Sequence, residues 1–313
     1  MLRYAIERLI VMVPTVFVLA LVLFVLMRLT PGSPLQPNAA NANPLSPEQQ
    51  ELLAKEWGLD RPILEQFVVY LDKAAHLDFG TSYYFKTRTV MEVLPPFIPV
   101  SLHLGLMALA LAIVVGGLLG VVAAMNQNGP VDYLCTFVAM LGVSLPNFVV
   151  AILMIWVFVL ILRVVPMTGG WQTPADWVLP TITLSLGPLA VIARYVRSSM
   201  IDVIRSDYVR TARAKGLAEQ RVVLVHVLKN ALIPPLTILG PIIAAVLTGS
   251  PFVEIIFRVP GVGRYFVESI LARDYPVMMA IFLFYGIFLQ VMNLVVDLAY
   301  GVADPRIRFG GAD

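Results

Sequence analysis

The chain alternates between long stretches without Asp, Glu, Lys or Arg and shorter polar segments. A helix that crosses a bilayer needs about 20 mostly apolar residues. Six uncharged stretches approach or exceed this length: Leu9–Met27, Ser101–Met125 within the longer Val93–Val131, Tyr133–Leu162, Trp177–Ala193, Asn230–Val253 and Tyr275–Val296. The pattern therefore predicts an all-α integral membrane protein with six transmembrane helices.

Two of these stretches need separate interpretation. Tyr133–Leu162 is too long for one straight perpendicular helix. Gly142 and Pro146 favour a bend within it; a tilted helix also fits, and division into a re-entrant pair is the less favoured alternative. Leu9–Met27 is long for the core of a signal peptide, and the sequence TPGSP follows shortly after it in place of a cleavage site. We therefore expect a retained helix.

The composition agrees with a membrane protein. The 313 residues are 59% hydrophobic and 13% charged, whereas soluble domains are typically about 45–50% apolar and roughly 25% charged. The single cysteine, Cys135, excludes a disulfide within the chain and a cysteine metal cluster, and no other metal site is expected.

The charges indicate how the chain is oriented. Basic residues outnumber acidic residues in Arg194–Lys229, between the fourth and fifth stretches. Loops on the cytoplasmic side of membrane proteins are enriched in Lys and Arg. With six crossings, this places both termini in the cytoplasm, although Arg258, Arg264 and Arg273 then fall outside.

The segment between the first two stretches is expected to form a small extracytoplasmic subdomain. We divide the chain into a first helix (1–30), this subdomain (31–99) and a five-helix core (100–313). Ser46, Pro47 and Gln49 predict the start of a helix that Gly58 ends. A second helix is predicted from Pro62 to about His76, with one apolar face formed by Leu64, Phe67, Val68 and Leu71.

The chain carries no sequence signature of its own energy source. It contains no GxxxxGK[ST], HExxH or CxxC motif. Ion-coupled carriers usually place Asp, Glu or His near the middle of the bilayer, and such residues are nearly absent from the six stretches. This argues against a stand-alone secondary carrier or channel, which stays the alternative. The stretches also contain no pair of residues that could form the catalytic site of an enzyme. Active transport would need energy from another protein.

Four polar residues within the stretches are candidates for lining a solute pathway. Hydrogen bonding between helices is the more frequent role of such residues. They are Ser144, Asn147, Gln290 and Asn293.

The basic segment DYVRTARAKGLAEQRVVLVHVLKN, residues 207–230, predicts two short helices. Gly216 favours a turn between Asp207–Lys215 and Glu219–Lys229, and Asp207 can cap the first helix. On that helix Val209, Ala212 and Gly216 share a small apolar face, which allows another backbone to approach closely. Another face carries Arg210, Arg213 and Leu217.

Four interpretations of this segment compete. A lipid-binding helix would carry large apolar anchors, but the first helix has Thr211, Ala212 and Ala214. Nucleic-acid binding would need a denser basic patch. A solvated loop explains the basic residues but not the Ala-x-Ala-x-Gly spacing. A docking site for a cytoplasmic protein explains both, so we favour it.

The sequence YVRTARAKGLAEQRVVLVHVLKNALIP resembles the cytoplasmic EAA loop of ABC importer permeases, in the form found in the dipeptide/oligopeptide permease family. Arg210, Thr211 and Ala212 stand at the EAA triplet, so that Arg replaces Glu, and Gly216 stands at the glycine. The resemblance extends over nearly the whole chain through ERLIVMVPT, TPGSP, WGLDRP, LDFGTS, VPGVGR, RDYP and YGVADPRIR.

This resemblance implies a permease subunit in a bacterial or archaeal inner membrane. It implies a pathway for short peptides shared with a second, homologous permease subunit, cargo from an extracytoplasmic solute-binding protein, and no nucleic acid. One or two cytoplasmic ATPases would bind ATP and Mg, and this chain would bind no cofactor. The cargo stays open, because relatives of the family also carry nickel, glutathione, opines or oligosaccharides.

The resemblance also implies which residues meet the ATPase. They lie in a coupling loop at about 198–230. The expected docking residues are Tyr208, Arg210, Thr211, Ala212, Arg213, Ala214, Lys215 and Gly216, with His226, Leu228 and Asn230 closing the second helix.

Overall fold

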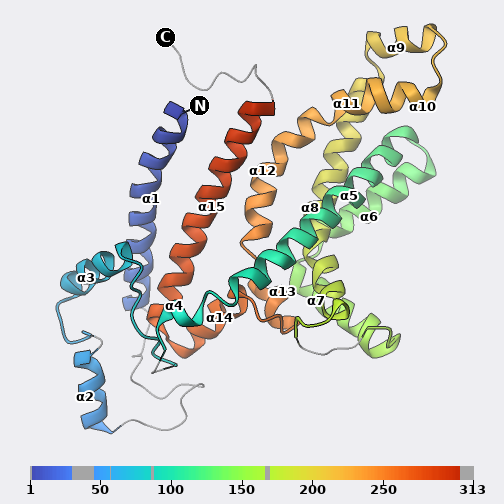
Figure 1. Ribbon diagram of the computed structural model, residues 1–313. Coiled ribbons are helices and arrows are strands. Elements are labelled where there is room, and N and C mark those ends of the chain that lie inside the picture. Colours follow the sequence, from blue (N-terminus) through green and yellow to red (C-terminus); the bar gives the residue numbers. More distant parts are fainter. Residues whose placement is uncertain (1, 30–45, 57, 86–87, 166–169, 304–313) are drawn as a thin grey trace.

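The computed structural model describes residues 2–29, 46–56, 58–85, 88–165 and 170–303 (Figure 1). Apart from one isolated bridge between Thr81 and Thr89, the regular structure of these residues is helical, as expected. The helices are α1 (Leu2–Leu29), α2 (Pro47–Glu56), α3 (Ile63–Ala75), α4 (Val90–Val93), α5 (Ile98–Met125), α6 (Pro130–Ser144), α7 (Asn147–Met154), η1 (Ile155–Ile161), α8 (Pro174–Ile204), α9 (Asp207–Ala214), α10 (Glu219–Arg221), η2 (Val222–Val227), α11 (Leu228–Ala231), α12 (Ile233–Leu247), α13 (Pro251–Ile256), α14 (Val262–Ala272) and α15 (Tyr275–Ala303).

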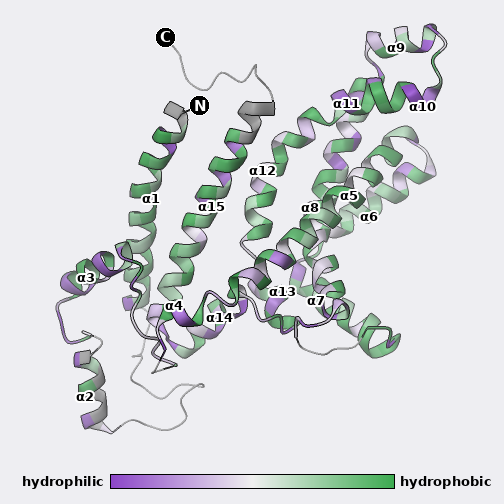
Figure 2. Cartoon of the chain, viewed as in Figure 1, coloured by the Kyte–Doolittle hydropathy of each residue, from purple (hydrophilic) through white to green (hydrophobic). Residues whose placement is uncertain are grey.

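Four of the described helices, α1, α5, α8 and α15, are long and apolar enough to cross a membrane. The number rises to six if two bent pairs each count as one span: α6 with α7 and η1, and the segment from α10 to α11 with α12. Figure 2 shows these helices as mainly hydrophobic, with hydrophilic residues gathered at α9 and α10 and at α2 and α3. Six crossings therefore remain a prediction.

The third predicted stretch is divided more sharply than a bent or tilted helix would be. The two helices on either side of Leu145 and Pro146 meet at 109°. Pro146 has no backbone N–H to continue the helix of α6, so the break falls there. Gly142 is not part of the bend: a Cβ at this position would lie 2.4 Å from the carbonyl oxygen of Leu186 in α8, so the glycine permits close packing.

The fifth predicted stretch is also less regular than expected. Its uninterrupted helix, α12, covers only Ile233–Leu247. Gly249, with a φ of 82°, follows Thr248 at the end of this helix and separates it from α13. Before α12, the segment from α10 to α11 ends at Ala231 and meets α12 at an angle of 50°. After α12, the last residues of the stretch belong to α13.

The helices α5, α6 and α8 pack tightly through glycines. Without side chains at Gly116 and Gly120, α5 approaches the backbone of α8: a Cβ would lie 2.7 Å from the Leu189 carbonyl oxygen and 2.6 Å from that of Ala193, respectively. Small residues allow such close approach of helices within membranes. Because Gly142 does the same for α6, these three helices form one closely packed unit, while α1 packs on α15 (Figure 1).

The subdomain after α1 contains the two predicted helices, α2 and α3, and residues 30–45, with all of TPGSP, lie outside the described part. Gly58 follows α2 with a φ of 65°, as its role as a stop predicts. The predicted apolar face of α3 needs correction. Phe67 is buried against Phe24 of α1, but Leu64 and Val68 are exposed. The buried stripe runs instead through Phe67, Tyr70, Leu71 and Ala74.

Candidate functional site

The candidate site is the α9 loop, which we define as residues 206–231. It protrudes from the end of α8, on the side of the molecule where α1 begins and α15 ends (Figure 1). Ser206 stands at the N-cap position of α9, with extended backbone angles, and Asp207 is the first helical residue instead of the predicted cap. Gly216 has a φ of 75°, which reverses the chain after α9 as predicted.

The inner face of α9 is apolar and occupied. Val209 and Ala212 are buried in a cluster with Val222 and Val227 of η2 and Val196 of α8. The small face expected to admit another protein is therefore covered by the loop itself. Ala212 supports the loop from inside and is not part of its exposed surface.

The outer face of α9 is polar and exposed. Its exposed residues are Asp207, Tyr208, Arg210, Thr211, Arg213 and Ala214, and the exposed surface continues through Lys215 and Gly216 after the helix. Arg210 forms only a long contact with Asp207, at 3.5 Å between Nη1 and Oδ1. This surface therefore offers cationic and hydroxyl groups to a partner.

Arg213 is bound within the loop, although the sequence suggested that it meets a partner. Its Nη2 donates to Oε1 of Glu219 at 2.6 Å, and its Nε donates to Oε2 at 3.1 Å. This bidentate pair joins α9 to α10 across the turn at Gly216 and fixes their relative orientation.

The predicted second helix, Glu219–Lys229, has three consecutive parts, α10, η2 and α11, of which η2 is a π-helix. His226 and Leu228 are half-buried and Asn230 is exposed, with its Nδ2 donating to the His226 carbonyl oxygen at 3.0 Å. Leu228 packs against the apolar cluster. These residues lie where the loop joins α12; contact with an ATPase stays a prediction for them.

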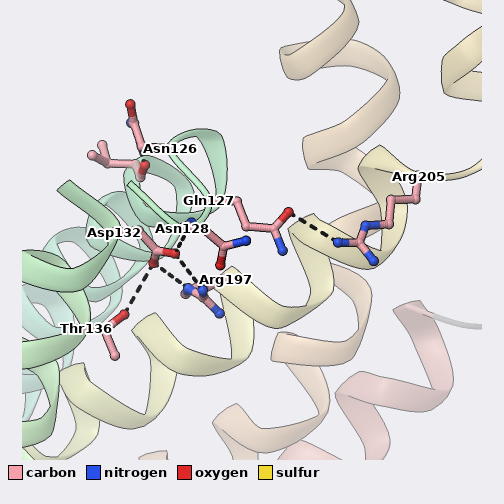
Figure 3. A network of polar contacts seen from close by, with 8 residues as sticks. Asn126, Gln127, Asn128, Asp132, Thr136, Arg197 and Arg205 are labelled. Carbon is pink, nitrogen blue, oxygen red and sulfur yellow. Dashed lines mark hydrogen bonds and ion pairs between the residues drawn. The ribbon is translucent and has the colours of Figure 1, made fainter. Parts of the chain in front are cut away.

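A second feature, missed by the sequence interpretation, lies beside the loop: a clasp between Asp132 of α6 and Arg197 of α8 (Figure 3). The two carboxylate oxygens accept hydrogen bonds from Nε and Nη2 of Arg197, both at 2.6 Å. The backbone N–H of Asn128 donates to the same carboxylate at 2.9 Å, and the Thr136 hydroxyl at 3.4 Å. The side chain of Asp132 is only 2% exposed and that of Arg197 is 30% exposed.

The turn that precedes α6, next to the clasp, borders a common space with the α9 loop. A cavity of about 480 Å³ lies between the turn from Asn126 to Val131 and the Arg213–Glu219 pair. Arg205, just before the loop, also donates to Oε1 of Gln127 in that turn at 3.4 Å. One signal could have found the clasp: Asp132 begins an otherwise uncharged stretch, and such a carboxylate needs a cation.

The four candidate pathway residues are not brought together in the single chain. Ser144 is exposed and Asn147 half-buried on either side of the break between α6 and α7. Gln290 and Asn293 lie on α15. Because α6 packs on α5 and α8, whereas α15 packs on α1, α12 and α14, pathway lining stays a prediction.

Comparison with known proteins places both features in a family. Residues 116–309 match the family described as the binding-protein-dependent transport system inner membrane component, and residues 1–94 match the N-terminal part described for such membrane components. The chain belongs to this family. The α9 loop and the clasp both fall within the larger match. The protein is therefore a multi-pass transporter subunit of the inner membrane.

Relatives in this family match almost end to end. The dipeptide transport system permease protein DppB of Bacillus subtilis (strain 168) is 43% identical over 308 residues, 98% of each chain. The oligopeptide transport system permease protein OppB of Escherichia coli (strain K12) is 40% identical over 311 residues, 99% of this chain and 100% of that protein.

Solved structures agree on the fold of these transport components. The inward-facing MetNI methionine ABC transporter aligns with a TM-score of 0.58 at 16% identity, over 68% of this chain and 97% of the matched chain. An amino acid ABC transporter solved with histidines aligns with a TM-score of 0.51, over 67% and 92%. At such low identity the likeness concerns the fold alone.

Proposed function

We propose that this chain is a permease subunit of an ABC importer that carries short peptides. The observation that supports the cargo is the identity of 43% and 40% to proteins named as dipeptide and oligopeptide permeases, over nearly the full length of both chains. The match includes the outer subdomain as well as the helical core, so it covers more than the fold common to ABC importers.

The α9 loop is the proposed docking site for a cytoplasmic ATPase. Its exposed face carries Tyr208, Arg210 and Lys215, which can contact acidic and polar groups of a partner. Its inner face is fixed by the apolar cluster with η2 and α8. A force on the outer face is therefore passed to the end of α8 without first deforming the loop.

A movement of α8 caused by this force would be transmitted to two further helices, α5 and α6. The glycine contacts tie α5 and α6 to α8, and the Asp132–Arg197 clasp ties α6 to α8 a second time near the loop. The unit α5–α6–α8 would move as one body, and the break at Pro146 is the point at which α7 changes its angle to it. Alternating access would then result from rocking of this unit when the ATPases close.

The remaining parts of the proposal concern topology and partners. The start of α1, the end of α15 and the α9 loop lie at one end of the molecule, which supports two cytoplasmic termini (Figure 1). Six crossings follow if each bent pair is one span. A second, homologous permease would complete the pathway at the interface, one or two ATPases would bind ATP and Mg, and a solute-binding protein would deliver cargo at the opposite end.

Gly216 provides the test of the docking loop. A Cβ at Gly216 would meet nothing within 4 Å, so a substitution acts through the φ of 75° alone. We expect Gly216→Val to abolish uptake in the purified complex, because a β-branched residue cannot hold this conformation, and to leave membrane insertion intact. Gly216→Asn is the matched control, since Asn tolerates positive φ, and should keep uptake. Normal coupling of ATP hydrolysis to uptake in Gly216→Val would overturn the docking assignment.

Co-purification and reconstitution test the rest. The chain isolated from its native membrane should carry a second permease and at least one ATPase. Proteoliposomes with this complex and its binding protein should accumulate labelled dipeptides or oligopeptides only with ATP. Uptake by the chain alone, without an ATPase, would favour a stand-alone carrier, and ATP-driven uptake of a different solute class would correct the cargo while keeping the importer.

A further inference from the structure

The helix α3 carries exposed apolar residues that the proposed function leaves unexplained. Ile63 is 61% exposed, Leu64 78% and Val68 59%, although the sequence places α3 in a loop outside the membrane. Phe67, on the same helix, is buried against α1. The helix thus has a packed apolar stripe and an unpacked apolar flank side by side.

The position of α3 along α1 shows what surrounds this flank. The ring of Phe67 lies 5.9 Å from that of Phe17 and 5.1 Å from that of Phe24. These residues precede Leu29, the end of the candidate span, by twelve and five positions, which is roughly 18 and 8 Å at about 1.5 Å per residue. Figure 1 shows α3 beside this part of α1, running across it, and nearer to the α9-loop end than α4 and α14.

This depth lies within the hydrocarbon. The candidate span Ala5–Leu29 has 25 residues, a length of about 37 Å against a hydrocarbon core of about 30 Å. When the excess length of the helix is divided equally between its two ends, the hydrocarbon core begins about 4 Å inside Leu29. The Phe67 ring then lies roughly 4–14 Å below that boundary.

The polar residues of α3 are arranged as an interfacial helix requires. At about 100° per residue, Leu64 and Val68 flank the buried stripe on one side, whereas Glu65, Asp72 and Lys73 occupy the far side of the helix. Glu65 and Asp72 are exposed. An amphipathic helix that lies in the plane of the bilayer buries its apolar face about 5–10 Å into the headgroup and acyl boundary and keeps its charged face in water.

We infer that α3 is a membrane-interface helix whose flank, Leu64 and Val68, contacts lipid acyl chains of the leaflet opposite to the α9 loop. It packs on α1 with one half of its apolar arc and meets lipid with the other half. The subdomain is thereby held at a fixed height on the membrane, and α2, which lies farther from the α9-loop end in Figure 1, is left for contacts in water.

Spin labels at single cysteines test this assignment. The complex is reconstituted into bilayers with Cys135 replaced by alanine, the partner subunits free of cysteine, and labels introduced by Leu64→Cys or Val68→Cys. Asp72→Cys and Glu65→Cys are the matched controls on the adjoining polar face of the same helix. Each variant is first shown to retain uptake, which establishes that it folds and assembles.

For each spin label, the frequency of collision with oxygen, which concentrates in the bilayer, is compared with the frequency of collision with a water-soluble nickel chelate. We expect oxygen to dominate at positions 64 and 68 and the chelate to dominate at 65 and 72, a reversal within one helical turn. Low collision with both reagents at 64 and 68 would show a protein partner, such as the second permease or the binding protein, and would overturn the inference. Dominant collision with the chelate at 64 and 68 would show water there and would overturn it equally.

Discussion

The two ends of the molecule hold buried carboxylates in different ways. At the α9-loop end, Asp132 accepts two hydrogen bonds from the guanidinium of Arg197. At the opposite end, Glu254 and Asp274 are buried and are held by hydroxyl groups and backbone N–H groups. The first end uses a charged partner, and the second uses neutral donors.

Glu254 is the centre of the neutral arrangement. Its Oε1 accepts from the Ser101 hydroxyl at 3.0 Å and its Oε2 from the Arg264 N–H at 3.1 Å. The Ser101 Oγ in turn accepts from the N–H of Val262 at 2.9 Å. A Cβ at Gly261 would lie 2.4 Å from Oε2, so the VPGVGR sequence can close around the carboxylate only because it is glycine-rich. This network ties α5 to α13 and α14.

Asp274 ties the outer subdomain to the helical core in a similar way. It accepts hydrogen bonds from the Ser82 hydroxyl and from the N–H of Tyr83 at 3.0 Å and of Tyr84 at 3.3 Å. The segment after α3 is thereby held at the start of α15.

Access to water explains why one end pairs its buried carboxylate with a charged group and the other end with neutral donors. Arg197 is partly exposed, so its charge remains hydrated on one side while it neutralises Asp132. Glu254 lies where water does not reach, and neutral donors offset burial incompletely. Burial accordingly raises the pKa of Glu254 and of Asp274 above their ordinary values, against the opposing effect of their hydrogen bonds.

Removal of the Glu254 carboxylate should have the largest effect on stability. Glu254→Ala leaves the Ser101 hydroxyl and the Arg264 N–H without this acceptor and creates a cavity, which together should cost about 3 kcal/mol. The measurement is the temperature at which Cys135, buried in the fold, becomes reactive to a thiol reagent, read by mass spectrometry of the purified complex. Glu268→Ala, at an exposed pair on α14, is the control and should change little. Equal reaction temperatures for the two variants would contradict the central role of Glu254.

Removal of the cation at the other end should have the next largest effect. Arg197→Met leaves Asp132 buried without its charged partner, at a cost of about 2–3 kcal/mol, less than for a fully enclosed pair because Arg197 borders water. The same Cys135 measurement applies, since this residue lies one turn from Asp132. The double variant Asp132→Asn with Arg197→Met removes the unpaired charge and should recover much of the loss. No recovery would show that the arginine acts through packing instead of charge.

The pH dependence of stability should report the buried state of Glu254. Because the pKa of Glu254 is raised in the folded protein above its ordinary value of 4.5, the folded state binds the proton more tightly. Its stabilising contribution is therefore complete below the ordinary value and is lost as pH rises through the raised one. Unfolding temperature should fall across this window in the parent protein and fall less in Glu254→Gln. Parallel pH profiles for the two proteins would contradict the raised pKa.

The smallest effect is expected for the exposed pair of the α9 loop. Glu219→Gln weakens the bidentate contact with Arg213, but both side chains reach water, so no measurable change in unfolding temperature is expected. Arg197→Met serves as the contrasting variant in the same assay. A shift as large as that of Arg197→Met would mean that exposure does not explain the difference between these two ion pairs.

Much of the fold could be predicted from local sequence. Uncharged stretches located α1, α5, α8 and α15, and Pro146 marked a break although its angle could not be foreseen. Gly58 and Gly216 marked chain reversals because a positive φ is a local property that glycine adopts readily. The stretch Asn230–Val253 was less well predicted, since hydropathy reveals neither the 50° bend before α12 nor the turn at Gly249 after it.

The candidate site was predicted in position and not in orientation. The two-helix form of residues 207–230 followed from charge and spacing, yet Ala212 was assigned to the docking surface and is buried inside the loop. Arg213 pairs with Glu219 and stays exposed, so its contact with a partner stays a prediction. A helical pattern gives the faces of α9 relative to one another. It does not say which face the chain covers with its own η2.

By itself, the sequence determined that this chain lies in a membrane, where most of its long helices run, where it turns at Gly216, and which family it resembles. Only the tertiary structure decided the partners of its buried charges. Asp132 and Arg197 are separated by 65 residues and Ser101 and Glu254 by 153. Hydropathy, helix propensity and glycine conformation act over a few residues, whereas contacts over such separations arise only when packed helices bring distant segments together.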